Sequence, residues 1–235
     1  MENHVDDYTG VSHDEGLRAY FIGIFNRMLL GLLITAGVAY SLPGLLPGIE
    51  DSMNGGAYRI FWWVAVAFEF ILIFVIASKA TSMNGAAATT WFYVFAALNG
   101  FTLLPITYVY TQESIALAFV SAASVFAGAA LYGYTTKKDI TGWGNILFMG
   151  LIGLIVAMLI NLFLASSMFG YLLSIAGVVL FTALTAWDMQ KLKKLYFDNP
   201  ERAEQMAACG ALDLYLDFIN LFLFILRLIG VKVKD

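Results

Sequence analysis

Charged residues are scarce in this chain, and the few that are present lie in short groups. Asp, Glu, Lys and Arg make up 13% of the 235 residues, whereas 60% of the residues are hydrophobic and the mean hydropathy is +0.79. In soluble domains about a quarter of all residues are charged, and these residues cover the surface. This composition excludes a soluble fold and indicates that the chain is dissolved in a lipid bilayer.

Cysteine and histidine are also nearly absent, the chain has no basic tail, and each absence argues against a class of function. Cys209 is the single cysteine, so no intrachain disulfide can form, and we expect a buried, inert thiol. His4 and His13 both lie near the N-terminus, which argues against a metal site or a catalytic histidine. The net charge of −4 without a basic tail excludes nucleic acid as a partner. Residues 1–27 lack the features of a cleavable signal peptide.

Long runs of hydrophobic residues make up most of the chain. Six of them can cross a hydrocarbon core: Met28–Leu46, Ile60–Ser78, Ala86–Tyr110, Ser114–Tyr134, Gly144–Ala165 and Met168–Trp187. A seventh, Gly210–Val231, carries Asp213, Asp217 and Arg227 and must be shielded from lipid. The prediction is an all-α polytopic membrane protein with seven transmembrane helices. We expect a polar cytoplasmic tail at 1–27, one transmembrane domain at 28–231 and a short C-terminal tail at 232–235.

The distribution of lysine and arginine predicts the orientation in the membrane. Nine of these residues lie on the N-terminal side of the predicted spans and four on the other side. Because cytoplasmic loops are enriched in Lys and Arg, the N-terminus is expected in the cytoplasm. Seven crossings then leave the C-terminus outside. Arg227, Lys232 and Lys234 fit poorly there, so a last segment that turns back is the alternative.

Acidic side chains at membrane depth are the candidate functional residues, and they number four: Glu69, Asp188, Asp213 and Asp217. Each costs roughly 2.5–3.5 kcal/mol on insertion, so such residues face the bundle interior, pair with one another or line a pathway. Asp213, Asp217, Asn220 and Arg227 are spaced to share one face of the last helix. Because this polar stripe must point inward, the last helix is expected at the centre of the bundle.

Asp188 and Asp217 are expected to meet. Asp217 lies roughly 10 Å inside the start of its helix, and Asp188 lies about one turn inside the end of an antiparallel neighbour. Two buried carboxyls within hydrogen-bond reach cannot both ionise cheaply, so they would share one proton. When both are ionised, they repel each other and offer oxygen ligands that suit calcium. The pair therefore predicts calcium passage that is gated by protons.

Structural interpretations of the same residues stay open. Asp188 is equally consistent with an ion pair to Lys191, one turn further on. Asp213 is better explained as a residue at the water boundary near the helix start. Glu69 lies in the middle of the second span, where a structural partner such as Asn99 or a tyrosine is as consistent as a role in transport.

Several motifs resemble one family. The run LYLDFINLF at Leu214–Phe222, followed by Leu226 and Arg227, resembles the last-helix signature of the Bax inhibitor-1 (transmembrane Bax inhibitor motif) family. Tyr132–Ala157 and Leu184–Lys194 are similar to its bacterial members, so the resemblance covers essentially all seven spans. It implies a bacterial inner-membrane protein in which two three-helix layers wrap a central C-terminal helix.

The resemblance also implies a function and a set of residues. It implies a calcium leak that is sensitive to pH through an aspartate pair, which falls on Asp188 and Asp217 here. The family usually has Tyr before the first of these aspartates, where this chain has Trp187. The family also tends to carry an acidic residue within the second helix and a basic residue near its end. Glu69 and Lys79 are the nearest counterparts.

Three classes of function follow. The leading one is a calcium-permeable channel or leak, or a proton-coupled exchanger, without a cofactor. The second is an interaction protein of the stress or cell-death regulator type, which restrains a membrane-bound quality-control protease through its acidic N-terminal tail. The third is an intramembrane aspartyl protease. The sequence argues against this third class, because Gly210-Ala211-Leu212-Asp213 lacks the second glycine of the Gly-x-Gly-Asp run in such enzymes. We therefore do not expect an enzyme.

Overall fold

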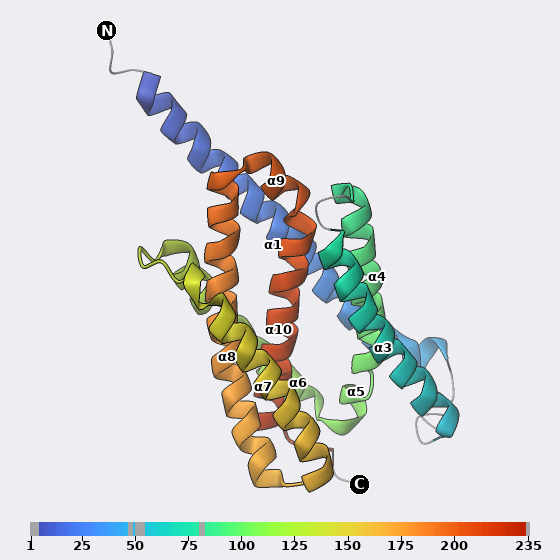
Figure 1. Ribbon diagram of the computed structural model, residues 1–235. Helices are drawn as coiled ribbons and strands as arrows, with labels where there is room; N and C mark the ends of the chain where they lie inside the picture. The colour runs from blue at the N-terminus through green and yellow to red at the C-terminus, as the bar shows by residue number, and fades with distance from the viewer. Residues whose placement is uncertain (1–4, 47–48, 50–54, 80–82, 234–235) are drawn as a thin grey trace. The chain divides into compact units, whose positions relative to one another are not determined.

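The computed structural model describes residues 5–46, 49, 55–79 and 83–233, and it is almost wholly helical over them (Figure 1). One isolated antiparallel bridge joins Tyr110 to Lys232. Seven helices are long and apolar enough to cross a membrane. The expected all-α architecture with seven spans is therefore confirmed.

The helices fall into two compact units. In chain order the elements are α1 Val5–Leu45, α3 Gly56–Ser78, α4 Gly85–Leu103, α5 Ile106–Val109, α6 Gln112–Thr135, the short 3-10 turn η1 Thr141–Trp143, α7 Gly144–Leu164, α8 Ser167–Asp198, α9 Pro200–Gln205 and α10 Ala207–Ile229. The first unit comprises Met1–Thr102 and Leu192–Leu212, and the second comprises Leu103–Lys191 and Asp213–Asp235. The division therefore runs through α8 and α10.

Local sequence signals set several helix ends. Pro105 separates α4 from α5, because proline lacks the backbone N–H that a continuous helix would need there. Thr111 caps α6, and its hydroxyl oxygen accepts a hydrogen bond from the Ser114 N–H at 3.3 Å. Ala165 ends α7 in the left-handed conformation, with φ 48°. This turn leads directly into α8.

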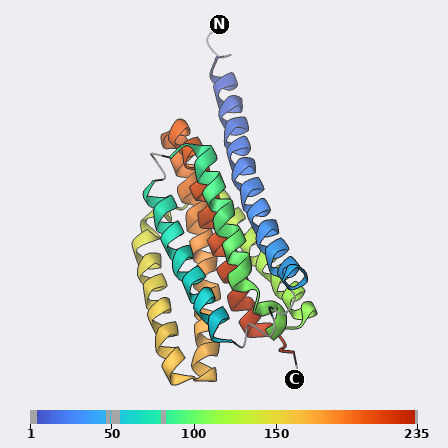
Figure 2. The same cartoon turned by 90° about the vertical axis from the view of Figure 1, so that its right-hand side faces the viewer.

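In the first unit, α1 begins much earlier than hydropathy predicts. Figure 2 shows α1 as one long helix, and it starts at Val5 instead of Met28. Leu17, Tyr20, Phe21 and Ile24 are at most 6% exposed. Their spacing of three and one residues forms the buried stripe of an amphipathic helix. Hydropathy averaged over a window misses such a stripe, because the charged residues around it, such as Asp14, Glu15 and Arg27, lower the mean.

The packing of α1 against α4 depends on close backbone contact. The Thr35 hydroxyl donates a hydrogen bond to the Ala96 carbonyl of α4 at 2.8 Å. A Cβ placed on Gly100 would lie 2.6 Å from the Thr35 carbonyl oxygen. Only glycine therefore fits at this approach of α4 to α1.

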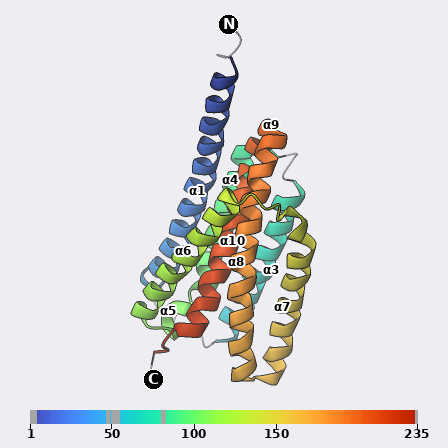
Figure 3. The same ribbon diagram turned by 90° about the vertical axis from the view of Figure 1, so that its left-hand side faces the viewer.

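In the second unit, α10 packs against α6 and α8. Phe218 of α10 meets Phe119 and Phe126 of α6 edge to face, at 5.2 and 5.7 Å between ring centroids. Phe224 of α10 stacks on Phe181 of α8 at 5.8 Å. Figure 3 shows α8 and α10 side by side and α7 joined to α8 by a tight turn. These aromatic contacts fix α10 between two neighbours.

The last helix is by far the most buried of the seven spans. Of its 18-residue apolar window, 78% is buried, compared with 11–33% for the other six. This confirms that α10 is shielded from lipid. It is one continuous helix of 23 residues, about 35 Å long, which is sufficient to cross the bilayer.

The residues after α10 are tied to the connection between α5 and α6. The Thr111 N–H donates to the Val231 carbonyl and the Val233 N–H donates to the Val109 carbonyl, both at 3.0 Å. The Val231 N–H in turn donates to the Ser114 hydroxyl at 2.9 Å. This strap, Gly230–Val233, holds the C-terminal end of α10 in place.

Candidate functional site

Four charged side chains come together within the second unit, from two helices. Asp188 and Lys191 lie one turn apart on α8, and Asp213 and Asp217 lie one turn apart on α10. The helices run antiparallel, since Lys191 meets Asp213 at one end and Gly177 meets Phe224 further along. We call these four residues the carboxylate cluster.

Lys191 links the two helices. Its ammonium donates a hydrogen bond to Asp188 Oδ1 and another to Asp213 Oδ2, each at 3.1 Å. The same ammonium lies 4.8 Å from the centre of the Trp187 ring, within range of a cation–π contact. Two carboxylates from two helices therefore share one lysine.

The cluster has an exposed side and a buried side. The side chains of Lys191 and Asp213 are 41% and 38% exposed, whereas that of Asp188 is only 8% exposed. Asp217 is 4% exposed. The cluster is thus entered past Lys191 and Asp213, and Asp188 and Asp217 lie behind them.

Asp217 is the most unusual member. Its Oδ2 is buried and accepts no hydrogen bond from any residue that the structure describes. The groups that act on this carboxyl are Asp188, Asp213, Lys191 and the Thr185 hydroxyl. A buried polar atom without a partner is costly and rare, and it marks an oxygen that is available to a ligand or a proton.

The structure brings Asp188 and Asp217 into one cluster, as the sequence predicts, but with a different partner for Asp188. Among the described residues no hydrogen bond joins the two aspartates, and Asp188 is bound by Lys191. The ion pair considered as the alternative for Asp188 is therefore present. The sharing of a proton between Asp188 and Asp217 stays a prediction.

Sequence reasoning missed the part played by Asp213. It was assigned to the water boundary, and it is indeed partly exposed, but Lys191 also draws it into the cluster. The signal lay in two pairs of charges, each within one turn, on helices that run antiparallel. What the sequence lacks is the rotation of each helix about its own axis, which decides whether the pairs face each other.

The inward polar stripe that we expected on α10 is incomplete. Asn220 is half-buried, and its amide donates to the Leu216 carbonyl of the same helix at 2.8 Å. Arg227 is exposed, with its guanidinium 5.7 Å from the Phe224 ring. The expectation that Arg227 points inward is wrong. It lies in the last turn of α10, where a long cationic side chain favours the carbonyl end of the helix and the water boundary.

Glu69 belongs to the first unit and has structural partners there. It is 9% exposed, and its Oε1 accepts hydrogen bonds from Thr102 at 2.8 Å and from Asn99 at 3.4 Å. The expected partner Asn99 is confirmed, while Thr102 was not foreseen. Lys79 is exposed at the C-terminal end of α3, ten residues and about 15 Å of helix rise from Glu69.

Neighbouring residues hold α8 in position beside the cluster. The Trp187 indole N–H donates to the Thr141 carbonyl at 3.0 Å. Gln190 accepts from the Ile140 N–H and donates to the Lys138 carbonyl, both at 2.7 Å. Trp187 therefore acts as a hydrogen-bond donor through its ring nitrogen.

No group of three or more His, Cys, Asp or Glu side chains in the described part of the chain is arranged to hold a metal ion. Calcium prefers six to eight oxygen ligands. Asp188 and Asp217 as calcium contacts therefore remain a prediction. The positive charge present in the cluster is the ammonium of Lys191.

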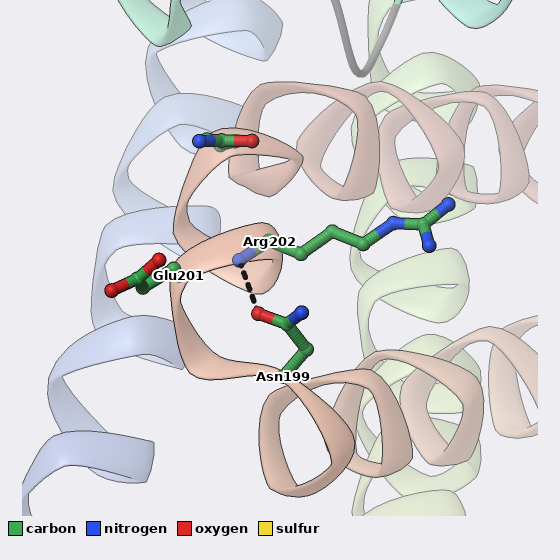
Figure 4. Close-up of a pocket in the computed structure, with 4 residues that line it drawn as sticks. Asn199, Glu201 and Arg202 are labelled. Carbon is green, nitrogen blue, oxygen red and sulfur yellow. Dashed lines mark hydrogen bonds between the residues drawn. The ribbon is translucent and has the colours of Figure 1, made fainter.

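A shallow depression in the first unit lies at the start of α9 and is lined by the residues that cap this helix. Asn199 Oδ1 accepts a hydrogen bond from the Arg202 N–H at 3.0 Å, and Glu201 and Gln205 complete the lining (Figure 4). Pro200 at the first helical position fits this role. The depression therefore contributes a helix start and no candidate site.

Fold and site together define a polytopic α-helical membrane protein with a carboxylate cluster between α8 and its most buried helix, α10. Residues 17–234 match the family described as "Inhibitor of apoptosis-promoting Bax1", Bax1-I. The match extends from Leu17 within α1 to beyond the end of α10. The chain belongs to the Bax inhibitor-1 family, as its motifs indicate.

Similar relatives are bacterial proteins of nearly the same length. Inner membrane protein YbhL of Escherichia coli (strain K12) is 38% identical over 219 residues, 92% of each chain. The uncharacterized protein RP147 of Rickettsia prowazekii is 39% identical over 221 residues, 92% of this chain and 91% of the relative. The uncharacterized membrane protein SpyM3_0260 of Streptococcus pyogenes is 39% identical over 232 residues, 98% and 99% of the two chains. The similarity therefore includes all seven spans.

Proposed function

We propose that this protein is a calcium-permeable channel or leak of the bacterial inner membrane, sensitive to pH, in which the carboxylate cluster is both ion contact and proton sensor. Asp217 supports this role most directly. Its buried, unpartnered oxygen lies among two further carboxylates, where a proton or a cation would complete its coordination.

Protons and calcium compete for the same oxygens in this proposal. A proton held between Asp188 and Asp217 removes their mutual repulsion and ties α8 to α10. Loss of that proton leaves two repelling carboxylates, which loosens the contact and offers oxygen ligands to calcium. Calcium flux should therefore rise as the pH rises.

The orientation in the membrane follows from the charge bias of the loops. With the N-terminus in the cytoplasm, the end of α8 and the start of α10 lie on the cytoplasmic side. The exposed side of the cluster, formed by Lys191 and Asp213, would then open toward the cytoplasm.

Calcium flux into proteoliposomes tests the proposal. Purified protein is reconstituted around a calcium-sensitive dye, and flux is followed while the external pH is stepped from mildly acidic to mildly alkaline. Asp217→Asn should flatten the pH dependence, because an amide cannot release the proton. Asp198→Asn is the matched control, since Asp198 is exposed on α8 and lies ten residues beyond Asp188.

Flux that keeps its full pH dependence in Asp217→Asn would contradict the proposal. A proton-coupled exchanger is distinguished from a leak by a pH-sensitive dye inside the same vesicles. An exchanger moves protons against calcium in a fixed ratio, whereas a leak moves calcium without that ratio.

A role as regulator of a membrane-bound quality-control protease is the second candidate. The observation that favours it is the early start of α1, which places helical backbone from Val5 ahead of the first buried residues. This extension suits contact with a partner. Deletion of residues 2–13 should abolish protease regulation and leave calcium flux intact; loss of flux together with regulation would contradict a separate partner surface.

A further inference from the structure

We propose that Lys191 is a tethered competitor cation, which a permeating ion must displace from Asp188 and Asp213, and that it thereby selects divalent over monovalent cations. This inference rests on the proposed function, because it concerns the same cluster. It adds a residue and a basis for selectivity that the aspartates alone do not supply.

The geometry places the ammonium where an entering cation would bind. Lys191 Nζ lies 3.1 Å from an oxygen of Asp188 on α8 and 3.1 Å from an oxygen of Asp213 on α10. An ion that approaches from the exposed side meets Asp213 and Lys191 before it reaches Asp188. The lysine therefore holds the outer position of the cluster.

Behind the lysine, one carboxylate oxygen of Asp217 lacks a hydrogen-bond partner among the described residues. Asp217 is 4% exposed, and its Oδ2 receives no hydrogen bond from the described residues. Lys191 is bonded to Asp188 and Asp213, so the cluster contains three carboxylates and a single ammonium. The cluster therefore has more acceptor oxygens than the lysine binds.

Charge decides which ions can displace the lysine. A monovalent ion that replaces the ammonium brings the same charge and gains little. Calcium brings twice the charge and binds oxygen at about 2.3–2.6 Å, closer than the ammonium, so its Coulomb attraction to the carboxylates is roughly two to three times greater. Displacement by calcium is therefore favoured, and displacement by sodium or potassium is not.

The displaced lysine has a place to go. Its side chain is 41% exposed and sits on a flexible four-carbon stem, so the ammonium can move into water without becoming a buried, unpaired charge. Trp187 lies 4.8 Å from Nζ and is itself fixed by its hydrogen bond to Thr141. The indole face thus keeps the ammonium near the cluster for its return.

Three variants separate charge from shape. Lys191→Met removes the charge and keeps a similar length. Lys191→Arg keeps the charge. Lys194→Met is the matched control, because Lys194 is exposed on the same helix, three residues further on.

Two readouts are measured on each full-length variant. The first is terbium luminescence of the purified protein in detergent, excited through tryptophan and competed with calcium, which reports binding. The second is proteoliposome flux of calcium and, separately, of sodium and potassium. Lys191→Met should bind terbium more tightly by on the order of tenfold and admit monovalent ions. Lys191→Arg and Lys194→Met should resemble the wild type.

The outcomes are distinguishable from failure of the proposed function. Absence of calcium flux in the wild type sinks the proposed function, while terbium binding still tests the lysine. Flux that depends on Asp217 while Lys191→Met keeps wild-type selectivity and terbium affinity overturns the inference. If Lys191→Met is aggregated on size exclusion, Lys191→Gln takes its place with the same expected gain. Loss of selectivity in Lys191→Arg would equally overturn it, because the competing charge is retained.

Discussion

Gly133 of α6 gives a sharp test of how the fold positions the carboxylate cluster. A Cβ at this position would lie 2.1 Å from the Ala186 carbonyl oxygen and 2.9 Å from the Ala186 carbonyl carbon and Cα. These are backbone atoms of α8, and they cannot move aside as a flexible side chain would. Overpacking of this kind costs about 1–3 kcal/mol, against a gain of about 1 kcal/mol when alanine replaces glycine within a helix.

Gly128 of the same helix supplies the matched control. A Cβ there would meet no atom within 4 Å, so Gly128→Ala should keep the whole gain in helix propensity. Gly133→Ala should consequently be less stable than Gly128→Ala by about 1–3 kcal/mol. At roughly 2–4 °C of Tm per kcal/mol for a chain of this size, thermal unfolding in detergent resolves the difference.

The same pair tests the link between packing and function. Ala186 directly precedes Trp187 and Asp188, so a displacement of α8 at Gly133 should also alter calcium flux in proteoliposomes. Gly128→Ala should leave flux unchanged. Equal Tm and equal flux in the two variants would refute the assigned contact between α6 and α8.

At three further positions, Ser114, Glu69 and Asn199, single contacts determine the expected effect of a substitution. Thermal unfolding measures the change in stability in each case. Ser114→Ala removes the acceptor for the Val231 N–H and should lower the free energy of unfolding by about 1–2 kcal/mol. Ser124→Ala, on the exposed face of α6, should be nearly neutral. Equal losses of stability in the two variants would contradict a stabilising strap. Glu69→Gln keeps an acceptor for Thr102 and should be nearly neutral, while Glu69→Leu should cost about 1–3 kcal/mol, and the reverse order would refute these hydrogen bonds. Asn199→Ala should lose about 1 kcal/mol, and no loss would show that the cap is dispensable.

Hydropathy and charge spacing predicted the spans and the buried last helix well, for a physical reason. A long run of apolar residues is needed to face lipid, and it is visible in any window of the sequence. Asp213 and Asp217 on one apolar helix indicated shelter within the protein, and α10 is the most buried span. The start of α1 was not visible in this way, because the stripe from Leu17 to Ile24 faces protein and follows a polar, acidic segment.

The candidate site was predictable only where its contacts lie within one helix. Lys191 follows Asp188 by three residues, and this spacing predicts their ion pair on any helix. Contacts between helices depend on how each helix is rotated and how closely the backbones approach, which the sequence does not encode locally. Asp213 beside Lys191 and Thr102 beside Glu69 are both of this kind.

The positive charge beside Asp213 and Asp217 of α10 belongs to Lys191 of α8. Arg227 of α10 lies ten residues from Asp217, about 15 Å along the helix, and is exposed, so it cannot neutralise the buried carboxyl. The positive charge nearest to the acidic face is Lys191 of the neighbouring helix, which is bonded to Asp188 and Asp213. Any motion that separates α8 from α10 must break one of these bonds and leave a carboxylate uncompensated. Under the proposed function, a cation that enters at that moment restores the balance, so opening of the contact and uptake of the ion favour each other.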